Sequence, residues 1–117
     1  MNWYLTKLVF RIVCGAGEHI PQFDEQLRLI TAYDEKEAFD KAFHLGKQEE
    51  DSFINSRNEI VQWLFINISE MKSLGSLSDG LELYSRIEEK DSAAHFINCV
   101  NRKAEKLRNE LPTHYKL

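Results

Sequence analysis

The sequence predicts an α+β fold, a two-layer sandwich in which a four-stranded antiparallel sheet of strand order 2-1-3-4 carries two helices on one face. Four segments alternate with the period of two that strands show, and two others repeat apolar residues every three or four positions, as helices do. Their order along the chain is strand, strand, helix, twice over, which gives the topology ββαββα. The first and third strands are the more apolar, so we expect them at the centre of the sheet and the second and fourth at its edges.

Length and composition limit the class of protein. At 117 residues the chain is long enough to bury a hydrophobic core without disulfide bonds or structural metal ions. We expect one domain over 1–117. The net charge of −4 disfavours a nucleic-acid binder, because phosphate affinity comes mainly from Lys and Arg. Cys14 and Cys99 lack metal-type spacing, which favours reduced thiols over a disulfide. Since neither a signal peptide nor a membrane span is evident, we expect a cytoplasmic protein.

The first predicted strand, from Trp3 to Cys14, has two different faces. One is almost purely apolar and is expected to face the core: Tyr4, Thr6, Leu8, Phe10, Ile12 and Cys14. The other mixes aliphatic, aromatic and basic groups: Trp3, Leu5, Lys7, Val9, Arg11 and Val13. A core does not need basic groups, and a plain solvated face would not carry so many apolar ones. The second face is therefore expected to meet a partner.

A glycine-containing loop ending at Pro21 leads into the second predicted strand, from Gln22 to Tyr33. The side chains of this strand that we expect to face the protein core are Phe23, Glu25, Leu27, Leu29 and Thr31. Asp34 followed by Glu37 is a capping-box pattern, so a helix is expected to begin there and to end near Glu50. Its apolar stripe consists of Ala38, Phe39, Ala42, Leu45 and Gly46. The acidic run 49–51 is expected on the solvated surface.

The third predicted strand runs from Ile60 to Ser69, and the fourth, from Leu81 to Ile87, follows the turn dipeptide at 79–80. The expected core residues of these two strands are Ile60, Gln62, Leu64, Ile66, Ile68, Leu81, Leu83, Ser85 and Ile87. A second helix is expected to begin at Asp91 or Ser92 and to end at Pro112. Its stripe consists of Ile97, Val100, Ala104, Leu107 and Leu111. The tail 113–117 is expected to be frayed.

The residues left on the second sheet face form the candidate interface or ligand site. They are Trp3, Lys7, Arg11, Asp24, Gln26, Arg28, Trp63, Phe65, Glu82, Tyr84 and Arg86. Aromatic residues and Arg are enriched at interface cores, and a homodimer stacked through this face is the first interpretation. Small-ligand or peptide binding and stacking of single-stranded nucleic acid on the same face are the alternatives.

The densest polar stretch runs from His19 to Gln26. A metal-dependent enzyme using His19, Asp24 and Glu25 is a further alternative, because an imidazole and two carboxylates can bind a divalent ion or act as a base. Asp24 and Glu25 should point to opposite faces of a strand, so they cannot share one site without a bulge. The sequence therefore favours a non-catalytic protein that needs no metal or other cofactor, and an enzyme remains open.

Several short stretches together resemble a known family. They are Trp3-Tyr4-Leu5-x-Lys7-x-Val9-Phe10, Pro21 to Gln26, Glu37-Ala38-Phe39-x-Lys41-Ala42, Trp63, and Asp79-Gly80-Leu81-Glu82. In these the chain is similar to a family of small bacterial proteins classed as domain of unknown function 4288. The resemblance covers nearly the whole chain and implies a free-standing domain. It implies no activity, cofactor or catalytic residue.

Overall fold

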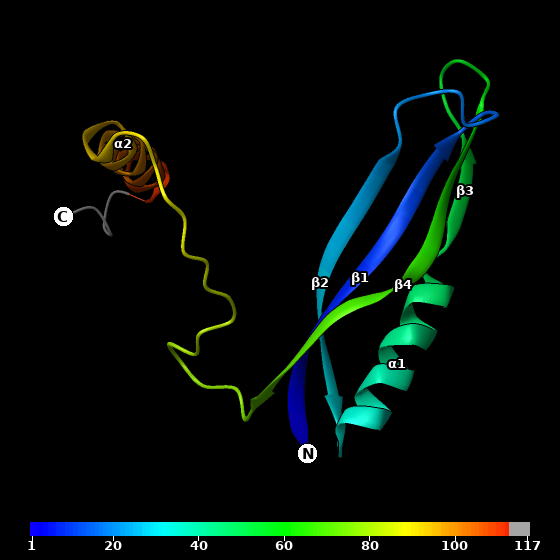
Figure 1. Ribbon diagram of the computed structural model, residues 1–117, viewed down its shortest axis with the longest axis horizontal. Coiled ribbons are helices and arrows are strands. Elements are labelled where there is room, and N and C mark those ends of the chain that lie inside the picture. Colours follow the sequence, from blue (N-terminus) through cyan, green and yellow to red (C-terminus); the bar gives the residue numbers. More distant parts are fainter. Residues whose placement is uncertain (113–117) are drawn as a thin grey trace. The chain divides into compact units, whose positions relative to one another are not determined.

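The computed structural model describes residues 1–112, which divide into two compact units. Unit 1 is Met1–Leu83, and unit 2 begins at Tyr84 (Figure 1). Unit 1 contains the sheet and one helix, and unit 2 contains the second helix. The predicted frayed tail lies outside the described residues, and the expectation of a single domain stays a prediction.

The sheet of unit 1 has four antiparallel strands in the order β2-β1-β4-β3 (Figure 1). β1 is Asn2–Cys14, β2 is Gln22–Ala32, β3 is Asp51–Ile54 and β4 is Ile60–Gly75. The antiparallel α+β class is confirmed, and so is the placement of the first predicted strand between the second and the third.

The predicted strand order 2-1-3-4 is wrong, because the fourth strand comes from a different segment. Residues 81–87 form no strand, whereas Asp51 to Ile54, predicted in part as solvated surface, pair with the start of β4. A short turn closes this hairpin. The side-chain oxygen of Asn55 accepts hydrogen bonds from the backbone N–H groups of Arg57 (2.9 Å) and Glu59 (3.0 Å). Closing so short a loop costs less chain entropy than the longer connection that the prediction required.

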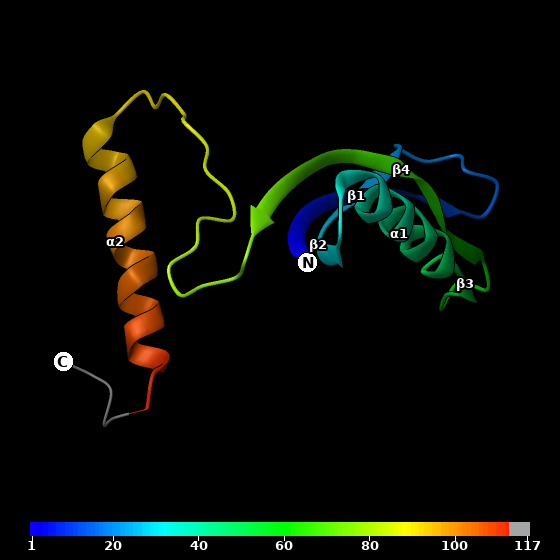
Figure 2. The same cartoon turned by 90° about the horizontal axis from the view of Figure 1, so that it is seen from below.

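Helix α1, Glu35–Gln48, begins as predicted, because the Asp34 carboxylate accepts a hydrogen bond of 2.8 Å from the N–H of Glu37. Its buried face consists of small residues: Ala38, Ala42 and Gly46. Small side chains let the helix approach the strands closely, and the sheet curls around it (Figure 2). One sheet face is therefore concave and covered in part by α1, and the other is convex.

The core confirms the predicted face of β1. Tyr4, Thr6, Leu8 and Phe10 are all buried. The predicted face of β2 is wrong, because Ile30 and Ala32 are the buried residues of that strand. In the β1–β2 hairpin, directly paired residues are both even-numbered or both odd-numbered, as in the pairs Tyr4–Ile30 and Leu5–Leu29. Side chains of paired residues share a face, so Phe23, Glu25, Leu27, Leu29 and Thr31 lie on the face away from α1.

The predicted face of the third strand is also wrong over most of its length. Val61 and Phe65 are buried, and Leu64 pairs with Arg11, on the face opposite to Leu8. Register shifts within the β1–β4 ladder, one of them between Val9 and Phe10, change the alternation along β4. Ile68 consequently pairs with Leu8 and packs against the core, as predicted. A strict period of two cannot anticipate such bulges.

Helix α2, Ala93–Glu110, forms as predicted, with Ser92 as its N-cap: the hydroxyl of Ser92 accepts a hydrogen bond of 3.2 Å from the N–H of His95. None of its residues is buried. The predicted sandwich with two helices on the sheet is not confirmed. Among residues 1–112, neither helix is long and apolar enough to cross a membrane.

Candidate functional site

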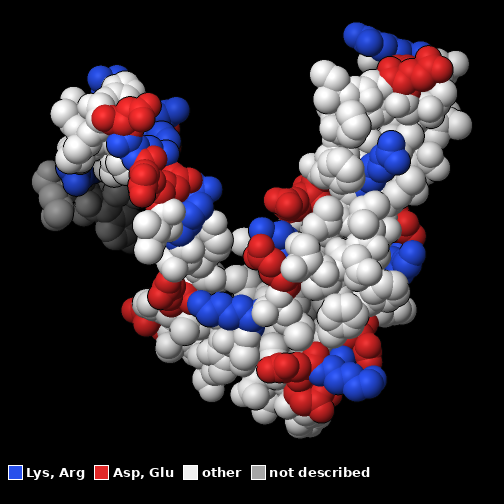
Figure 3. Space-filling view, in the orientation of Figure 1, with Lys and Arg blue, Asp and Glu red and all other residues white. Residues whose placement is uncertain are grey.

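The convex face of the sheet, here called the open face, is the candidate interaction surface of unit 1. It consists of Trp3, Leu5, Lys7, Val9 and Arg11 of β1, of Phe23, Glu25, Leu27, Leu29 and Thr31 of β2, and of Leu64, Asn67, Glu70 and Lys72 of β4. In the view of Figure 3, uncharged residues cover most of the visible surface of unit 1, and charged residues of both signs lie between them in small groups.

Large apolar side chains on the open face are exposed to water. Phe23 is 57% exposed, Leu27 is 52% exposed and Leu29 is 44% exposed. Leu29 pairs directly with Leu5 across the β1–β2 ladder, so the apolar surface continues from one strand to the next. Exposed apolar surface that is contiguous in this way usually marks an interaction site.

Charged groups interrupt this apolar surface at defined places. The Lys7 ammonium lies 3.4 Å from the Glu70 carboxylate, and the two residues are register partners across β1 and β4. Arg11 pairs with Phe23, and Val9 pairs with Glu25. These are neighbouring pairs on the same face of the β1–β2 ladder, so the Arg11 guanidinium and the Glu25 carboxylate lie near each other on the open face. Both signs of charge are thus present on the open face.

The concave face carries a chain of polar side chains next to the C-terminal end of α1. The Asp24 carboxylate accepts hydrogen bonds from the indole N–H of Trp63 (3.1 Å) and from the Gln26 amide (2.7 Å). Arg28 donates to the Gln26 oxygen at 2.9 Å and lies 3.2 Å from the Glu49 carboxylate. These groups link β4 to β2 and β2 to the end of α1.

Aromatic packing completes this arrangement. The Trp63 ring stacks on Phe53 of β3, with centroids 6.0 Å apart and an angle of 26° between the planes. A backbone hydrogen bond also contributes here, because the backbone N–H of Phe65 donates to the Glu50 carboxylate at 3.0 Å. With its indole N–H bound and its ring stacked, Trp63 is fixed in place, so we interpret the polar chain as a support for the half of the sheet that holds β3.

The structure divides the predicted site residues among three places. The members on the open face are Trp3, Lys7 and Arg11. The members on the concave face are Asp24, Gln26, Arg28, Trp63 and Phe65. The members outside the strands are Glu82, Tyr84 and Arg86. The predicted aromatic and basic residues therefore do not form one platform, and their proposed role stays a prediction.

Sequence reasoning missed Phe23, Leu27 and Leu29, which it assigned to the core. What identifies them is the register of the β1–β2 hairpin, in which odd-numbered residues of β2 pair with odd-numbered residues of β1. The residue types alone do not determine this register. Both faces of β2 contain apolar residues, so alternation permits either orientation.

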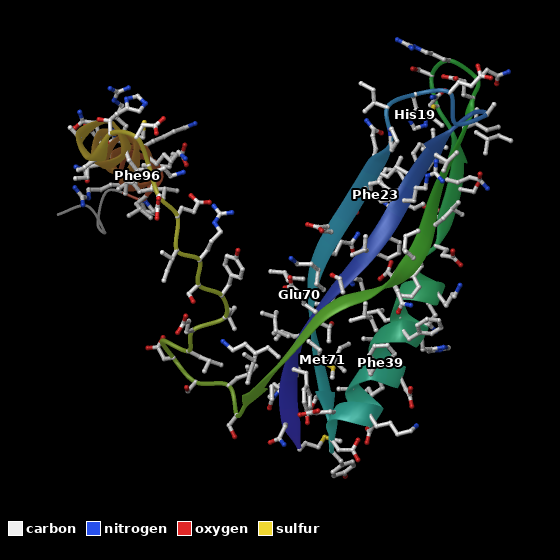
Figure 4. The ribbon with its side chains drawn as sticks, viewed as in Figure 1. His19, Phe23, Phe39, Glu70, Met71 and Phe96 are labelled. Atoms are coloured by element: carbon white, nitrogen blue, oxygen red, sulfur yellow. The ribbon has the colours of Figure 1, made fainter. Side chains whose placement is uncertain are left out.

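The loop between β1 and β2 contains His19 (Figure 4). Both nitrogens of its ring have hydrogen-bond partners. The backbone N–H of Cys14 donates to Nε2 at 3.0 Å, and Nδ1 lies 2.9 Å from the carbonyl oxygen of Ile20. Because the carbonyl can only accept, these partners assign the proton to Nδ1. The ring thus provides an acceptor for the last N–H of β1. Near it lies a hollow of about 810 Å³ lined by Cys14, Ala16, Glu18, His19, Ile20, Gln22, Arg57 and Glu59.

The predicted metal or catalytic group does not assemble. His19 lies in the loop, Asp24 binds Trp63 on the concave face, and Glu25 pairs with Val9 on the open face. Among residues 1–112, no group of three or more His, Cys, Asp or Glu side chains could hold a metal ion. The expectation that Asp24 and Glu25 point to opposite faces is confirmed.

His19→Ala is expected to lower the free energy of unfolding by about 0.5–1.5 kcal/mol, because it removes the hydrogen-bond acceptor of the half-buried N–H of Cys14. His44→Ala, at an exposed position of α1, should change it by less than about 0.5 kcal/mol. Urea denaturation measures both, and amide hydrogen exchange at Cys14 should accelerate in the first variant only. Equal stability of the two variants would contradict the assigned role of the ring.

Unit 2 has a small charged cluster before α2. Glu88 contacts Lys90 at 2.7 Å and Arg86 at 2.6 Å. The hydrogen bond from Lys90, with the nearby charge of Arg86, holds the pKa of Glu88 below its ordinary value. The cluster is exposed, so it adds little to stability.

Comparison with families of known proteins gives a match over most of the chain. A family model described as "Domain of unknown function (DUF4288)" matches residues 3–85. The matched region contains all four strands and α1, and α2 lies beyond it. No curated protein and no solved structure matches the chain.

Proposed function

Because the chain belongs to the DUF4288 family, whose description names no activity, we propose a function from its geometry: the protein is a non-catalytic binding domain that self-associates through its open face. The observation that carries this proposal is the exposure of Phe23, Leu27 and Leu29 on one continuous sheet face. Covering apolar surface of this kind gains about 25 cal/mol per Å².

A second copy of the chain fits this surface better than a strongly charged partner. Two-fold homodimers are the commonest oligomers, and their interfaces are the most apolar. Because the open face is convex, two copies meet first at the middle of the sheet, where Leu5 pairs with Leu29 and Leu27 pairs with Lys7. Arg11 of one copy can then approach Glu25 of the other. Such an ion pair at the interface helps to fix the alignment of the two copies more than it raises their affinity.

Leu27→Glu is expected to weaken the dimer by roughly 100-fold, because the two-fold axis introduces a carboxylate into the apolar contact of both copies. Sedimentation equilibrium over a range of protein concentrations measures the dissociation constant. Leu77→Glu is the matched control, since Leu77 is also exposed (44%) but follows the last strand. Circular dichroism should show that both variants stay folded.

Two results would contradict this proposal. The first is a wild-type chain that stays monomeric at about 100 µM, a concentration at which a typical specific dimer forms. The second is a dimer that Leu27→Glu and Leu77→Glu leave equally intact. Either result would favour the alternatives of a small ligand or a single-stranded nucleic acid on the open face. Labelled oligonucleotides in a salt series would distinguish these, since only nucleic-acid binding weakens steeply with salt.

The expectations of a bacterial origin and a cytoplasmic location accompany this proposal. A cytoplasm keeps thiols reduced, and Cys14 and Cys99 are free cysteines in the structure. Cell fractionation tests the location directly.

A further inference from the structure

Helix α2 is an amphipathic helix whose apolar side chains are exposed. Phe96 is 45% exposed, Ile97 is 55% exposed and Leu107 is 65% exposed (Figure 4 labels Phe96). The helix has 18 residues, and in proteins most of the stability of such a helix comes from packing of its amphipathic face rather than from helix propensity. A lasting helix therefore needs a surface that covers its apolar stripe.

The spacing of the stripe indicates what kind of surface that is. Its members are Ile97, Val100, Ala104 and Leu107 within α2 and Leu111 at its C-cap, and they alternate strictly between steps of three and four. A helix that packs on a sheet usually shows a broader stripe, whereas a strict three-four seam is typical of a helix that packs along another helix. We propose that α2 pairs in antiparallel orientation with α2 of a second copy of this chain.

The charges beside the seam select the antiparallel orientation. Lys103 and Glu110 lie along one side of the seam, and Asn101 and Arg108 lie along the other. In antiparallel coiled coils, residues on like sides meet. Lys103 then meets the partner's Glu110, and Asn101 meets the partner's Arg108, each twice by symmetry. A parallel pair instead places Lys103 beside the partner's Arg108, which is repulsive.

The same register matches side-chain size across the seam. Ala104 lies against the partner's Leu107, and Val100 lies against the partner's Leu111. Small residues opposite large ones let two helices pack closely. The remaining basic residues of the helix centre, Arg102 and Lys106, lie away from the seam and stay in water. The antiparallel orientation also places the positive N-terminal end of each helix beside the negative C-terminal end of the other.

This inference rests on the proposed function in one respect. A seam with four packed layers is short, so the helix pair gains from a second contact that raises the effective concentration of the partner. The open face supplies that contact. The tests of the two surfaces use different variants, so that each can fail alone.

Lys103→Glu in the full-length chain is expected to raise the dimer dissociation constant about tenfold, because two ion pairs become two like-charge pairs. The double variant Lys103→Glu with Glu110→Lys restores the attraction in reverse, so its dissociation constant should return to within about threefold of the wild-type value. Sedimentation equilibrium measures both. Arg102→Glu is the matched control, because it makes the same charge change away from the seam.

The other outcomes overturn the inference. A tighter dimer for Lys103→Glu indicates a parallel pair, since the introduced carboxylate would then meet the partner's Arg108. An effect equal to that of Arg102→Glu, or no rescue in the double variant, means that this side of α2 meets no second α2. If Leu27→Glu splits the dimer while Lys103→Glu does nothing, the helix pairing fails and the open-face proposal stands. The reverse pattern retains the helix pairing alone, and a wild-type monomer overturns both.

Discussion

Phe10→Ala is expected to lower the free energy of unfolding of the protein by about 3–5 kcal/mol. Phe10 is fully buried in the middle of β1, the strand that pairs with both β2 and β4. Its ring packs against Phe65 at a centroid distance of 5.4 Å. Alanine removes that contact and leaves a cavity between the sheet and α1, which the strands on either side cannot easily fill.

Urea denaturation followed by circular dichroism measures this loss. Phe39→Ala is the control, because Phe39 is 39% exposed on α1 and its truncation should cost about 1 kcal/mol or less. If the two variants lose equal stability, Phe10 is not the centre of the core.

Gly46→Ala is expected to destabilise the protein by about 1–3 kcal/mol, although alanine normally favours a helix over glycine by about 1 kcal/mol. An ideal Cβ at Gly46 would clash with Cε1 of the Phe65 ring. That ring also packs between Phe10 and Phe43, with centroids 5.4 Å from each, so it has little room to move. Overpacking therefore outweighs the gain in helix propensity.

A double-mutant cycle separates the clash from the propensity. Gly46→Ala should cost much less in a Phe65→Leu background, where the smaller side chain leaves room for the added methyl group. Thermal or urea unfolding gives the four stabilities. A more stable Gly46→Ala variant in the wild-type background would contradict the close approach of α1 to the sheet.

The parts of the fold that sequence predicted correctly are those fixed by local patterns. From Tyr4 to Phe10, every second residue of β1 belongs to one nearly apolar face, so the sequence itself indicates which face is buried. The Asp34 capping box lies directly before α1. The parts that it predicted wrongly depend on pairing between segments. β2 has apolar residues on both faces, and its orientation follows from hairpin register; in β4, bulges change the alternation near Phe65.

The candidate site was predictable to the same extent. Trp3, Lys7 and Arg11 lie on the open face as expected, because the face of β1 was predicted correctly. Trp63 and Asp24 were expected beside them, but they face α1 and bind each other. Their residue types suit an interface as well as a supported core, so only the register could decide between the two.

Hydroxyl-radical footprinting of the open face at two protein concentrations tests the central claim most directly. Moving from dilute monomer to concentrated dimer should reduce oxidation of Phe23, Leu27 and Leu29, because a second copy covers them, while Phe39 on α1 should react equally in both samples. Unchanged oxidation of the three open-face residues, in a sample that sedimentation shows to be dimeric, would contradict self-association through this face.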